Sequence, residues 1–222
     1  MPKKIHVGMR LPAEIIEYFG RGAGYIIRIQ NYITQGVMTS IRYKTLSLAS
    51  HHEDIPALCA MVSAGKDVNE PDESGTTALA WAVRYNRIDQ VLVLLGLGAD
   101  PNTLSVRGTG LNVMHEAAAE GRAPTVLALL AAGAEIDPRL PRNNRTPLML
   151  AAGKGHIQVV RILLGLGADP NLRDASGLTA AGIARQSAML HPRPTFYPFD
   201  EIADLIDRHC TGAEFRDDLD SH

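Results

Sequence analysis

The chain of 222 residues has little of what marks secreted, membrane or disulfide-stabilised proteins. Its two cysteines, Cys59 and Cys210, are too few for a disulfide framework and stand in no metal-ligand spacing, so we expect a cytoplasmic protein. The first twenty residues lack an apolar segment followed by a small-residue cleavage site, and no apolar run reaches about 18 residues. We therefore expect neither a signal peptide nor a membrane span.

Motifs for catalysis and cofactor binding are also missing. Gly20, Gly22 and Gly24 form Gly-x-Gly-x-Gly after a predicted helix, whereas a dinucleotide site needs Gly-x-Gly-x-x-Gly after a strand. No Walker sequence occurs, no serine or cysteine lies in a nucleophile motif, and the pair His51-His52 lacks further metal ligands. We expect no enzyme activity, no cofactor and no bound metal.

The charge is small overall but uneven along the chain. The net charge is −2, yet residues 1–46 hold seven Lys and Arg against Glu14 and Glu17, which gives +5 there and −7 in the remainder. Such an asymmetry favours an anionic partner for the N-terminal segment, or else a solvated basic face.

A short motif that is present recurs at a near-constant spacing. Gly-Leu-Gly-Ala-Asp-Pro-Asn stands at 96–102 and 165–171, and looser copies stand at 64–69 and 132–137. Their equivalent glycines are 33, 35 and 34 residues apart. A period near 33 predicts stacked repeats, a class of fold that usually presents binding surfaces.

The clearest repeat, 141–173, shows how each unit folds. Thr146 is a good N-cap and Pro147 suits the first turn of a helix that we expect Gly153 and Gly155 to end. A second apolar helix follows over 156–164, and a glycine-rich turn then forms a hairpin-like loop. Neither helix can bury its apolar face alone, so neighbouring repeats must stack.

The Thr-Pro-Leu opening, the paired helices and the Gly-Ala-Asp-Pro-Asn turn in fixed register resemble the ankyrin repeat. Thr77-Ala78-Leu79 opens another copy, and two extra residues near Ser105 lengthen the leading loop of a third. The resemblance implies a mainly α ankyrin-repeat solenoid of about five repeats including caps: 39–71, 72–104, 105–140, 141–173 and 174–212.

The terminal repeats are expected to be atypical, because one face of each meets solvent. In the first, Leu46, Leu48 and Ala49 occupy core positions of the inner helix, and the outer helix contributes Ile55, Leu58, Met61 and Val62. In the last, a proline-rich loop precedes an amphipathic capping helix over 200–210, and 213–222 forms a flexible acidic tail.

Partners of ankyrin proteins usually dock on hairpin tips and on the exposed side of the inner helices. The resemblance therefore implies a protein partner at these positions, unless they are merely solvated helix ends: Glu73, Thr76, Arg84, Tyr85, Glu120, Arg142, Arg145 and Lys154. Tyr and Arg often anchor interfaces, which favours Arg84, Tyr85 and Arg145. His115, at the start of an inner helix, is expected to be structural.

The first 38 residues do not fit the repeat. Apolar residues alternate over 4–11, which predicts a half-buried strand. Pro12 begins a short helix over 12–18, the glycines at 20–24 end it, and a second helix is predicted over 25–34. The segment is therefore expected to fold as strand, helix and helix.

This order resembles the ribbon-helix-helix fold, and most closely the BrnA-type antitoxins, through Leu11-Pro12-Ala13-Glu14-Ile15-Ile16-Glu17-Tyr18-Phe19, Gly22-Ala23-Gly24-Tyr25 and Arg28-Ile29. The resemblance implies a homodimer whose paired strands enter the DNA major groove. Base contacts would come from Lys4, His6 and Arg10, and phosphate contacts from the helix start at Ala23, Gly24 and Tyr25. Gly8 departs from the family pattern, so the central position of the strand that would contact the bases lacks a side chain.

Two functions follow from these resemblances. One is a non-enzymatic bacterial or phage regulator, antitoxin-like or a transcriptional repressor, which binds operator DNA through 1–38 and a protein partner, such as a toxin, through its repeats. The other is an ankyrin interaction module or effector, in which 1–38 is only a cap or a dimerisation ribbon.

Overall fold

The computed structural model describes residues 43–105, 111–190 and 198–211. The predicted strand-helix-helix segment, residues 191–197 of the proline-rich loop and the acidic tail lie outside the described residues, whereas 188–190 of the predicted loop belong to the helix that ends at Leu190. So do all the predicted DNA contacts: Lys4, His6, Arg10, Ala23, Gly24 and Tyr25.

The regular secondary structure of the described part of the chain is helical, and one helix pair lies in each predicted repeat range. An isolated antiparallel bridge between Leu104 and Asn112 is the only β pairing in this part. None of the described helices is long and apolar enough to cross a lipid bilayer. The helices are α3 (Leu46–His51), α4 (Ile55–Ser63), α5 (Ala78–Arg84), α6 (Ile88–Gly96), α7 (Val113–Ala119), α8 (Ala123–Ala131), α9 (Pro147–Lys154), α10 (Ile157–Gly165), α11 (Ala180–Leu190) and α12 (Phe199–Cys210).

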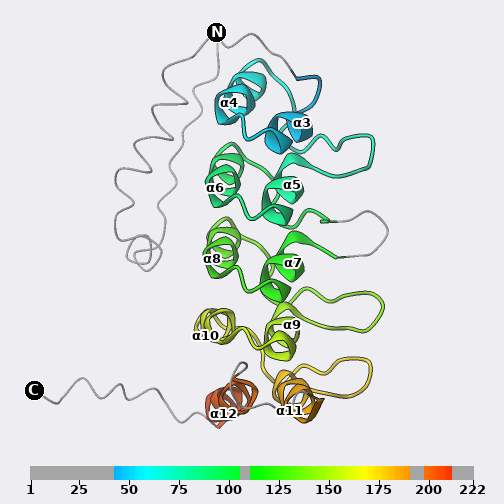
Figure 1. The fold of residues 1–222 in the computed structure, drawn as a ribbon, viewed down its shortest axis with the longest axis vertical. Coiled ribbons are helices and arrows are strands. Elements are labelled where there is room, and N and C mark those ends of the chain that lie inside the picture. The colour runs from blue at the N-terminus through cyan, green and yellow to red at the C-terminus, as the bar shows by residue number, and fades with distance from the viewer. Residues whose placement is uncertain (1–42, 106–110, 191–197, 212–222) are drawn as a thin grey trace, which may run out of the picture. The chain divides into compact units, whose positions relative to one another are not determined.

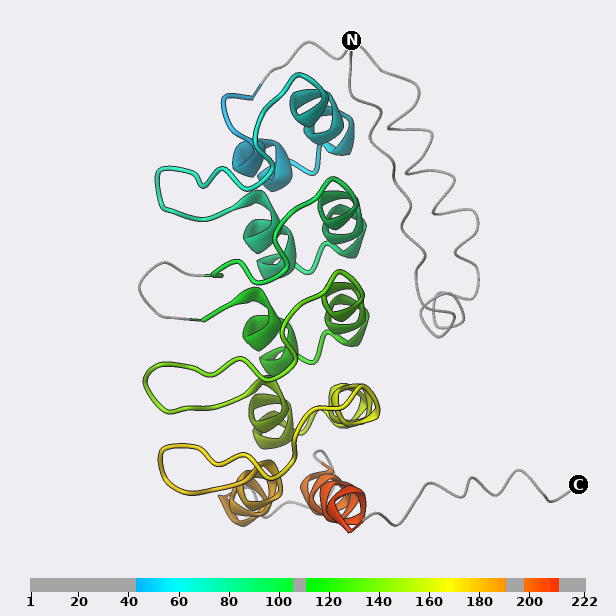
Figure 2. The ribbon, with the colours of Figure 1, turned by 180° about the vertical axis from the view of Figure 1, so that it is seen from behind.

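The helices fall into two compact units. Unit 1 consists of the described residues up to 117 together with 124–135, and unit 2 consists of 118–123 and the described residues from 136. Within unit 1, α3, α5 and α7 form one layer and α4, α6 and α8 the other, with the loops extending beyond the first layer (Figures 1 and 2). Within unit 2, α9 packs on α11, and α12 packs on both α10 and α11.

Polar side chains begin the inner helices at equivalent positions. The hydroxyls of Thr45, Thr77, Thr146 and Thr179 accept the backbone N–H three residues ahead, at 3.2 to 3.3 Å. Asn112 does the same for α7, at 3.0 Å. These bonds satisfy N–H groups that a helix start leaves without a partner, which is why each pair begins where the repeat pattern predicts.

The two glycines expected to end α9 have different roles. Gly155 follows the helix in the left-handed region, at φ 79°, as predicted. Gly153 lies inside the helix, so the prediction that it ends the helix is wrong. A Cβ at Gly153 would stand 2.9 Å from Cγ2 of Ile183, so the missing side chain allows α11 to approach closely.

The core follows the repeat pattern with one clear exception. Leu46, Leu58 and Met61 are buried in the first helix pair, as predicted, but Leu48 is 43% exposed. On a six-residue helix, only the face toward α4 and α5 is covered, and Leu48 lies outside it. At the other end, α12 buries its apolar stripe, including Ile202 and Ile206, which confirms the predicted amphipathic helix.

The glycine-rich turns are linked by side-chain hydrogen bonds within each unit. In unit 1, Oδ1 of Asn69 accepts the N–H of Asp100 at 2.7 Å, and Oδ1 of Asn102 accepts that of Glu135 at 2.9 Å. In unit 2, Oδ2 of Asp137 accepts the N–H of residue 169 at 2.9 Å. The residue at the last position of the motif, Asn69, Asn102 or Asp137, therefore ties each turn to the next.

Candidate functional site

Three aromatic side chains gather where the inner helices of unit 1 end. Trp81 on α5 and Tyr85, the residue that caps the C-terminal end of α5, stack with their ring centroids 5.4 Å apart and their planes at 7°. His51, at the end of α3, meets both rings edge-on, with centroid distances of 5.8 Å to Trp81 and 5.6 Å to Tyr85. We call these three residues the aromatic cluster. Tyr85 is 45% exposed, so the cluster offers a ring to solvent.

Arg84 holds the Trp81 side of the cluster. Its guanidinium carbon lies 5.1 Å from the centroid of the Trp81 ring, a cation–π arrangement. Nη2 donates to the carbonyl of Ser105 at 2.5 Å, and Nε lies 3.8 Å from the carboxylate of Glu116. The side chain is thus fixed by contacts on the following repeat.

Arg87 holds the Tyr85 side. Its guanidinium carbon lies 5.0 Å from the Tyr85 ring centroid, and Nη1 donates to the carbonyls of Ser50 and His51 at 2.6 and 2.8 Å. These carbonyls end α3, where a cation is favoured by the helix dipole. Nη2 also lies 2.9 Å from Glu53. Arg87 therefore binds the end of α3 to the aromatic cluster.

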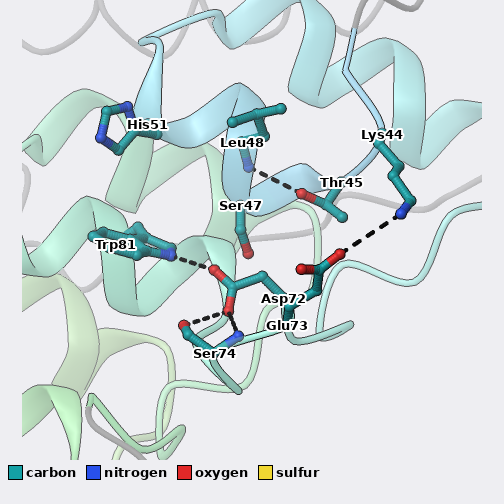
Figure 3. A pocket seen from close by; sticks show the side chains of 9 residues that line it. All are labelled: Lys44, Thr45, Ser47, Leu48, His51, Asp72, Glu73, Ser74 and Trp81. Atoms are coloured by element: carbon teal, nitrogen blue, oxygen red, sulfur yellow. Dashed lines mark hydrogen bonds and ion pairs between the residues drawn. The ribbon is translucent and has the colours of Figure 1, made fainter.

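Beside Trp81 lies a hollow of about 320 Å³, shown in Figure 3. Leu48 and Trp81 supply apolar surface, and the exposed ion pair between Lys44 and Glu73 (3.7 Å) crosses its rim. The side chain of Leu48, unexpected on the surface, forms part of this lining. The hollow is suited to an apolar side chain from outside the chain.

Asp72 fixes both the loop and the indole of Trp81. Its carboxylate accepts the indole N–H at 2.7 Å, the N–H and hydroxyl of Ser74 at 2.9 and 2.5 Å, and the N–H of Thr76 at 3.0 Å. Burial alone would raise its pKa, but these hydrogen bonds together hold the pKa below its ordinary value. Asp72 is therefore a charged positioning group whose acceptor capacity is used internally.

Four of the predicted partner contacts lie in unit 1, and all but Thr76 are exposed or half-exposed. Glu73 lies on the rim of the hollow, and Arg84 and Tyr85 belong to the surroundings of the aromatic cluster. Thr76 is only 4% exposed: its carbonyl accepts the hydroxyl of Ser47 at 2.9 Å. The prediction of Thr76 as a surface contact does not agree with this burial, because the threonine packs the loop onto α3.

The other predicted contacts lie in unit 2. Glu120, Arg142 and Lys154 are exposed, and Arg145 is half-exposed, with Nε 3.2 Å from the carboxylate of Asp174.

Sequence reasoning did not identify Trp81, His51, Leu48 or Asp72 as parts of a site. A signal was present, since Trp81 is the only tryptophan and stands four residues before Tyr85, the spacing of neighbours on one helix face. The contact with His51 had no such signal, because it joins two repeats.

The described residues contain no group of three His, Cys, Asp or Glu that could hold a metal ion. His115 is 1% exposed, with Nδ1 2.7 Å from Oδ1 of Asn112, as expected of a structural histidine. Burial raises the pKa of the Cys59 thiol, which favours its unreactive protonated form.

Comparison with known proteins agrees with the repeat geometry. The family model described as ankyrin repeat matches residues 74–105, and the one described as ankyrin repeats (many copies) matches 129–184. A putative ankyrin repeat-containing protein of Treponema pallidum is 34% identical over 124 residues, 56% of this chain and 41% of that protein. Palmitoyltransferase Hip14 of Drosophila melanogaster is 35% identical over 114 residues, 51% of this chain and 17% of that protein. Protein PhlB of Serratia liquefaciens is 36% identical over 117 residues, 53% of this chain and 51% of that protein.

The chain therefore spans about half or less of the length of these relatives. The matched segments coincide with helix pairs joined by the glycine-rich turns. The structure and the comparisons therefore agree on ankyrin repeats over 74–105 and 129–184.

Proposed function

We propose that the chain is a non-catalytic, cytoplasmic protein-binding module, and that a partner segment lies across the aromatic cluster and the adjoining hollow. The observation that carries this is the stacked pair of Trp81 and Tyr85, held in place by Arg84, Arg87 and Asp72. Rigid aromatic side chains lose little conformational entropy on binding, and Trp, Tyr and Arg are the commonest anchors of interfaces.

The hollow suggests how such a segment would be held. An apolar side chain of the partner would pack on Leu48 and Trp81, and the chain on either side would reach Glu73 and Tyr85. Because the walls are already fixed by hydrogen bonds and ion pairs, binding would require little reorganisation. In unit 2, Glu120, Arg142, Arg145 and Lys154 are proposed as partner contacts that are separate from the aromatic cluster.

The test begins with peptides selected from a random library against the full chain. We expect amide exchange to slow over 44–52 and 72–87 on binding, and the affinity of the Tyr85→Ala variant to fall about tenfold. Leu166→Ala is the matched control, since Leu166 is 46% exposed and lies on another unit. Selected peptides that bind the Tyr85→Ala variant as well as the native chain would refute the proposal.

A second candidate function rests on the sequence pattern of 1–38 alone. In that proposal the segment pairs with a second copy and binds operator DNA through Lys4, His6 and Arg10, while the repeats bind a toxin. The Lys4→Ala/Arg10→Ala variant is then expected to lose operator affinity while remaining a dimer. Light scattering on the full chain, with a monomeric mass as the result, would exclude the paired strands and leave 1–38 as a cap.

A further inference from the structure

Three exposed arginines, Arg139, Arg142 and Arg173, lie on two loops of unit 2 that are bonded to each other. Nη1 of Arg139 donates to the carbonyl of Arg173 at 3.1 Å. A second bond runs from the N–H of Ala175 to the carbonyl of Asn143, at 2.8 Å. The two loops therefore present their arginines together, and we call these three residues the arginine cluster.

Two of the three guanidinium groups of the cluster, those of Arg139 and Arg173, are positioned by backbone carbonyls rather than by carboxylates. Arg139 uses the carbonyl of Arg173, and Nη1 of Arg173 donates to that of Gly177 at 2.7 Å. Arg142 is exposed and makes no side-chain bond within the described part of the chain. A guanidinium has five donors, so one bond to a neutral carbonyl leaves both its charge and most of its donors available.

The carboxylate at the centre of these loops is already paired. Asp174 is 6% exposed and accepts the N–H groups of Ser176 and Leu178 at 2.9 and 3.1 Å, together with Nε of Arg145 at 3.2 Å. Burial would raise its pKa, but these bonds hold the pKa below its ordinary value. Asp174 thus stays charged and offsets Arg145, and it forms no ion pair with the arginine cluster.

Two further carboxylates border the cluster without bonding to it. Asp137 is close enough to Arg139 to feel its charge, but Oδ2 of Asp137 accepts the N–H of Asp169. The carboxylate of Asp169 in turn accepts the N–H of Asn171 at 2.9 Å. Both acids lie in the turns that lead into the loops, and the charge of Asp137 partly offsets that of Arg139.

From this arrangement we infer that the arginine cluster is a second interaction surface, which binds an acidic peptide segment. Planar guanidinium groups match carboxylates in paired hydrogen bonds, and the hydrogen bonds that hold Arg139 and Arg173 reduce the entropy lost on binding. A nucleic-acid duplex is the less fitting ligand, because its dense line of charge would also meet Asp137 and Asp169. The inference concerns a different unit from the aromatic cluster and does not depend on it.

The probe for this surface is a fluorescein-labelled 12-residue peptide of Glu, Asp, Gly and Ser, with a Gln/Asn version as its neutral control. Measured by anisotropy with the full chain, the acidic peptide should bind and the neutral one should not. The Arg142→Ala/Arg173→Ala variant should bind about tenfold more weakly. Thermal unfolding establishes that the variant is folded, and Arg142→Ala alone serves if it is not.

The matched control is Arg161→Ala/Arg208→Ala, which removes the same charge from exposed positions on α10 and α12. Its affinity should stay within about twofold of the native chain. Equal losses in both double variants would overturn the inference, because the binding would then reflect net charge only. Tighter binding of a DNA duplex than of the acidic peptide would overturn it as well. The Tyr85→Ala variant should still bind the acidic peptide with the affinity of the native chain. This result is therefore independent of whether the aromatic cluster binds a partner.

Discussion

Units 1 and 2 repeat one helix pair but differ in what they expose. Trp81 on α5 and Tyr85 at its C-terminal end correspond, 69 residues on, to Leu150 and Lys154 on α9. Among Phe, Tyr and Trp residues, the described part of unit 2 contains only Phe199, and it is buried. Repeat packing thus constrains the buried positions and leaves the exposed ones free to carry different binding chemistry.

The loops of the two units also differ in the side chains they position, although both contain the same aspartate-centred turn. Asp72 and Asp174 each accept two backbone N–H groups two and four residues ahead, around Gly75 and Gly177 in the left-handed region. The remaining oxygen differs: that of Asp72 accepts the indole of Trp81, whereas that of Asp174 accepts Arg145. A common turn therefore positions an aromatic side chain in one unit and a basic one in the other.

The largest expected effect tests whether the buried layers are equivalent. Leu94 and Leu163 stand at equivalent positions and are both 0% exposed. Leu94→Ala and Leu163→Ala should each lower the free energy of unfolding by about 2 to 5 kcal/mol, through lost burial and the cavity that remains. Urea unfolding of the full chain measures both, and a loss below about 1 kcal/mol in either would break the equivalence.

The next effect concerns the shared aspartates. Asp72→Asn and Asp174→Asn should each lower stability by about 1 to 3 kcal/mol at pH 7, because the charge-assisted hydrogen bonds to the N–H groups of each loop are weakened. Both folded-state pKa values lie below their ordinary value, so the stabilisation exists above the unfolded pKa and is lost as the pH falls through the folded pKa. Unfolding measured from pH 7 down to about 3 should show the native chain converging on both variants. A constant difference across that range would contradict the assignment.

A smaller effect separates the exposed positions. Tyr85→Ala should lower stability by about 1 kcal/mol, because the stacked pair with Trp81 and the contact with Arg87 are lost. Lys154→Ala, at the equivalent exposed position, should stay within about 0.5 kcal/mol of the native chain. Thermal unfolding compares the two variants, and equal effects would mean that the aromatic cluster adds nothing to unit 1.

The smallest expected effect is a gain in stability, produced by a substitution of Asp137. Asp137 stands where unit 1 has Asn69, whose Nδ2 donates to the carbonyl of Gly98 at 3.4 Å. Oδ1 of Asp137 is buried without a hydrogen-bond partner, and burial raises the pKa of its carboxyl. Asp137→Asn should therefore stabilise the chain by about 0.5 to 1 kcal/mol at pH 7, since an amide can donate where a carboxylate cannot.

The pH dependence of that gain has a definite sign. A raised folded-state pKa means that ionisation of Asp137 opposes folding above the unfolded pKa, and that this penalty disappears when the pH falls below it. The advantage of Asp137→Asn should shrink below about pH 4. An advantage that grows with acidity would show that the carboxylate is stabilising instead.

Much of the fold could be predicted because it depends on local chemistry that repeats. Thr146 begins α9 and Gly155 follows it, as their capping roles predict, since both roles depend on the backbone of one turn. Gly153 was mispredicted for the opposite reason: the residue that requires a glycine there, Ile183, lies on another helix 30 residues away. The exposure of Leu48 likewise depends on how far α4 and α5 cover a short helix.

Exposed contact residues could be predicted from the sequence only where the residue type and its position on a helix were sufficient evidence. Tyr85 and Arg84 follow from their position on an inner helix, but the partners that hold them, His51 and Ser105, come from neighbouring repeats. Thr76 has the sequence position of a surface contact, yet its carbonyl bonds to α3 and the residue is buried.

By itself, the sequence determined the period, the capped helix pairs and the glycine turns, because each arises from contacts within a few residues. Tertiary structure decided which exposed side chains act together: the aromatic cluster of unit 1 and the arginine cluster of unit 2 both form between repeats. Contacts across a gap of about 30 residues depend on how one helix pair lies on the next, which no local pattern in the chain encodes.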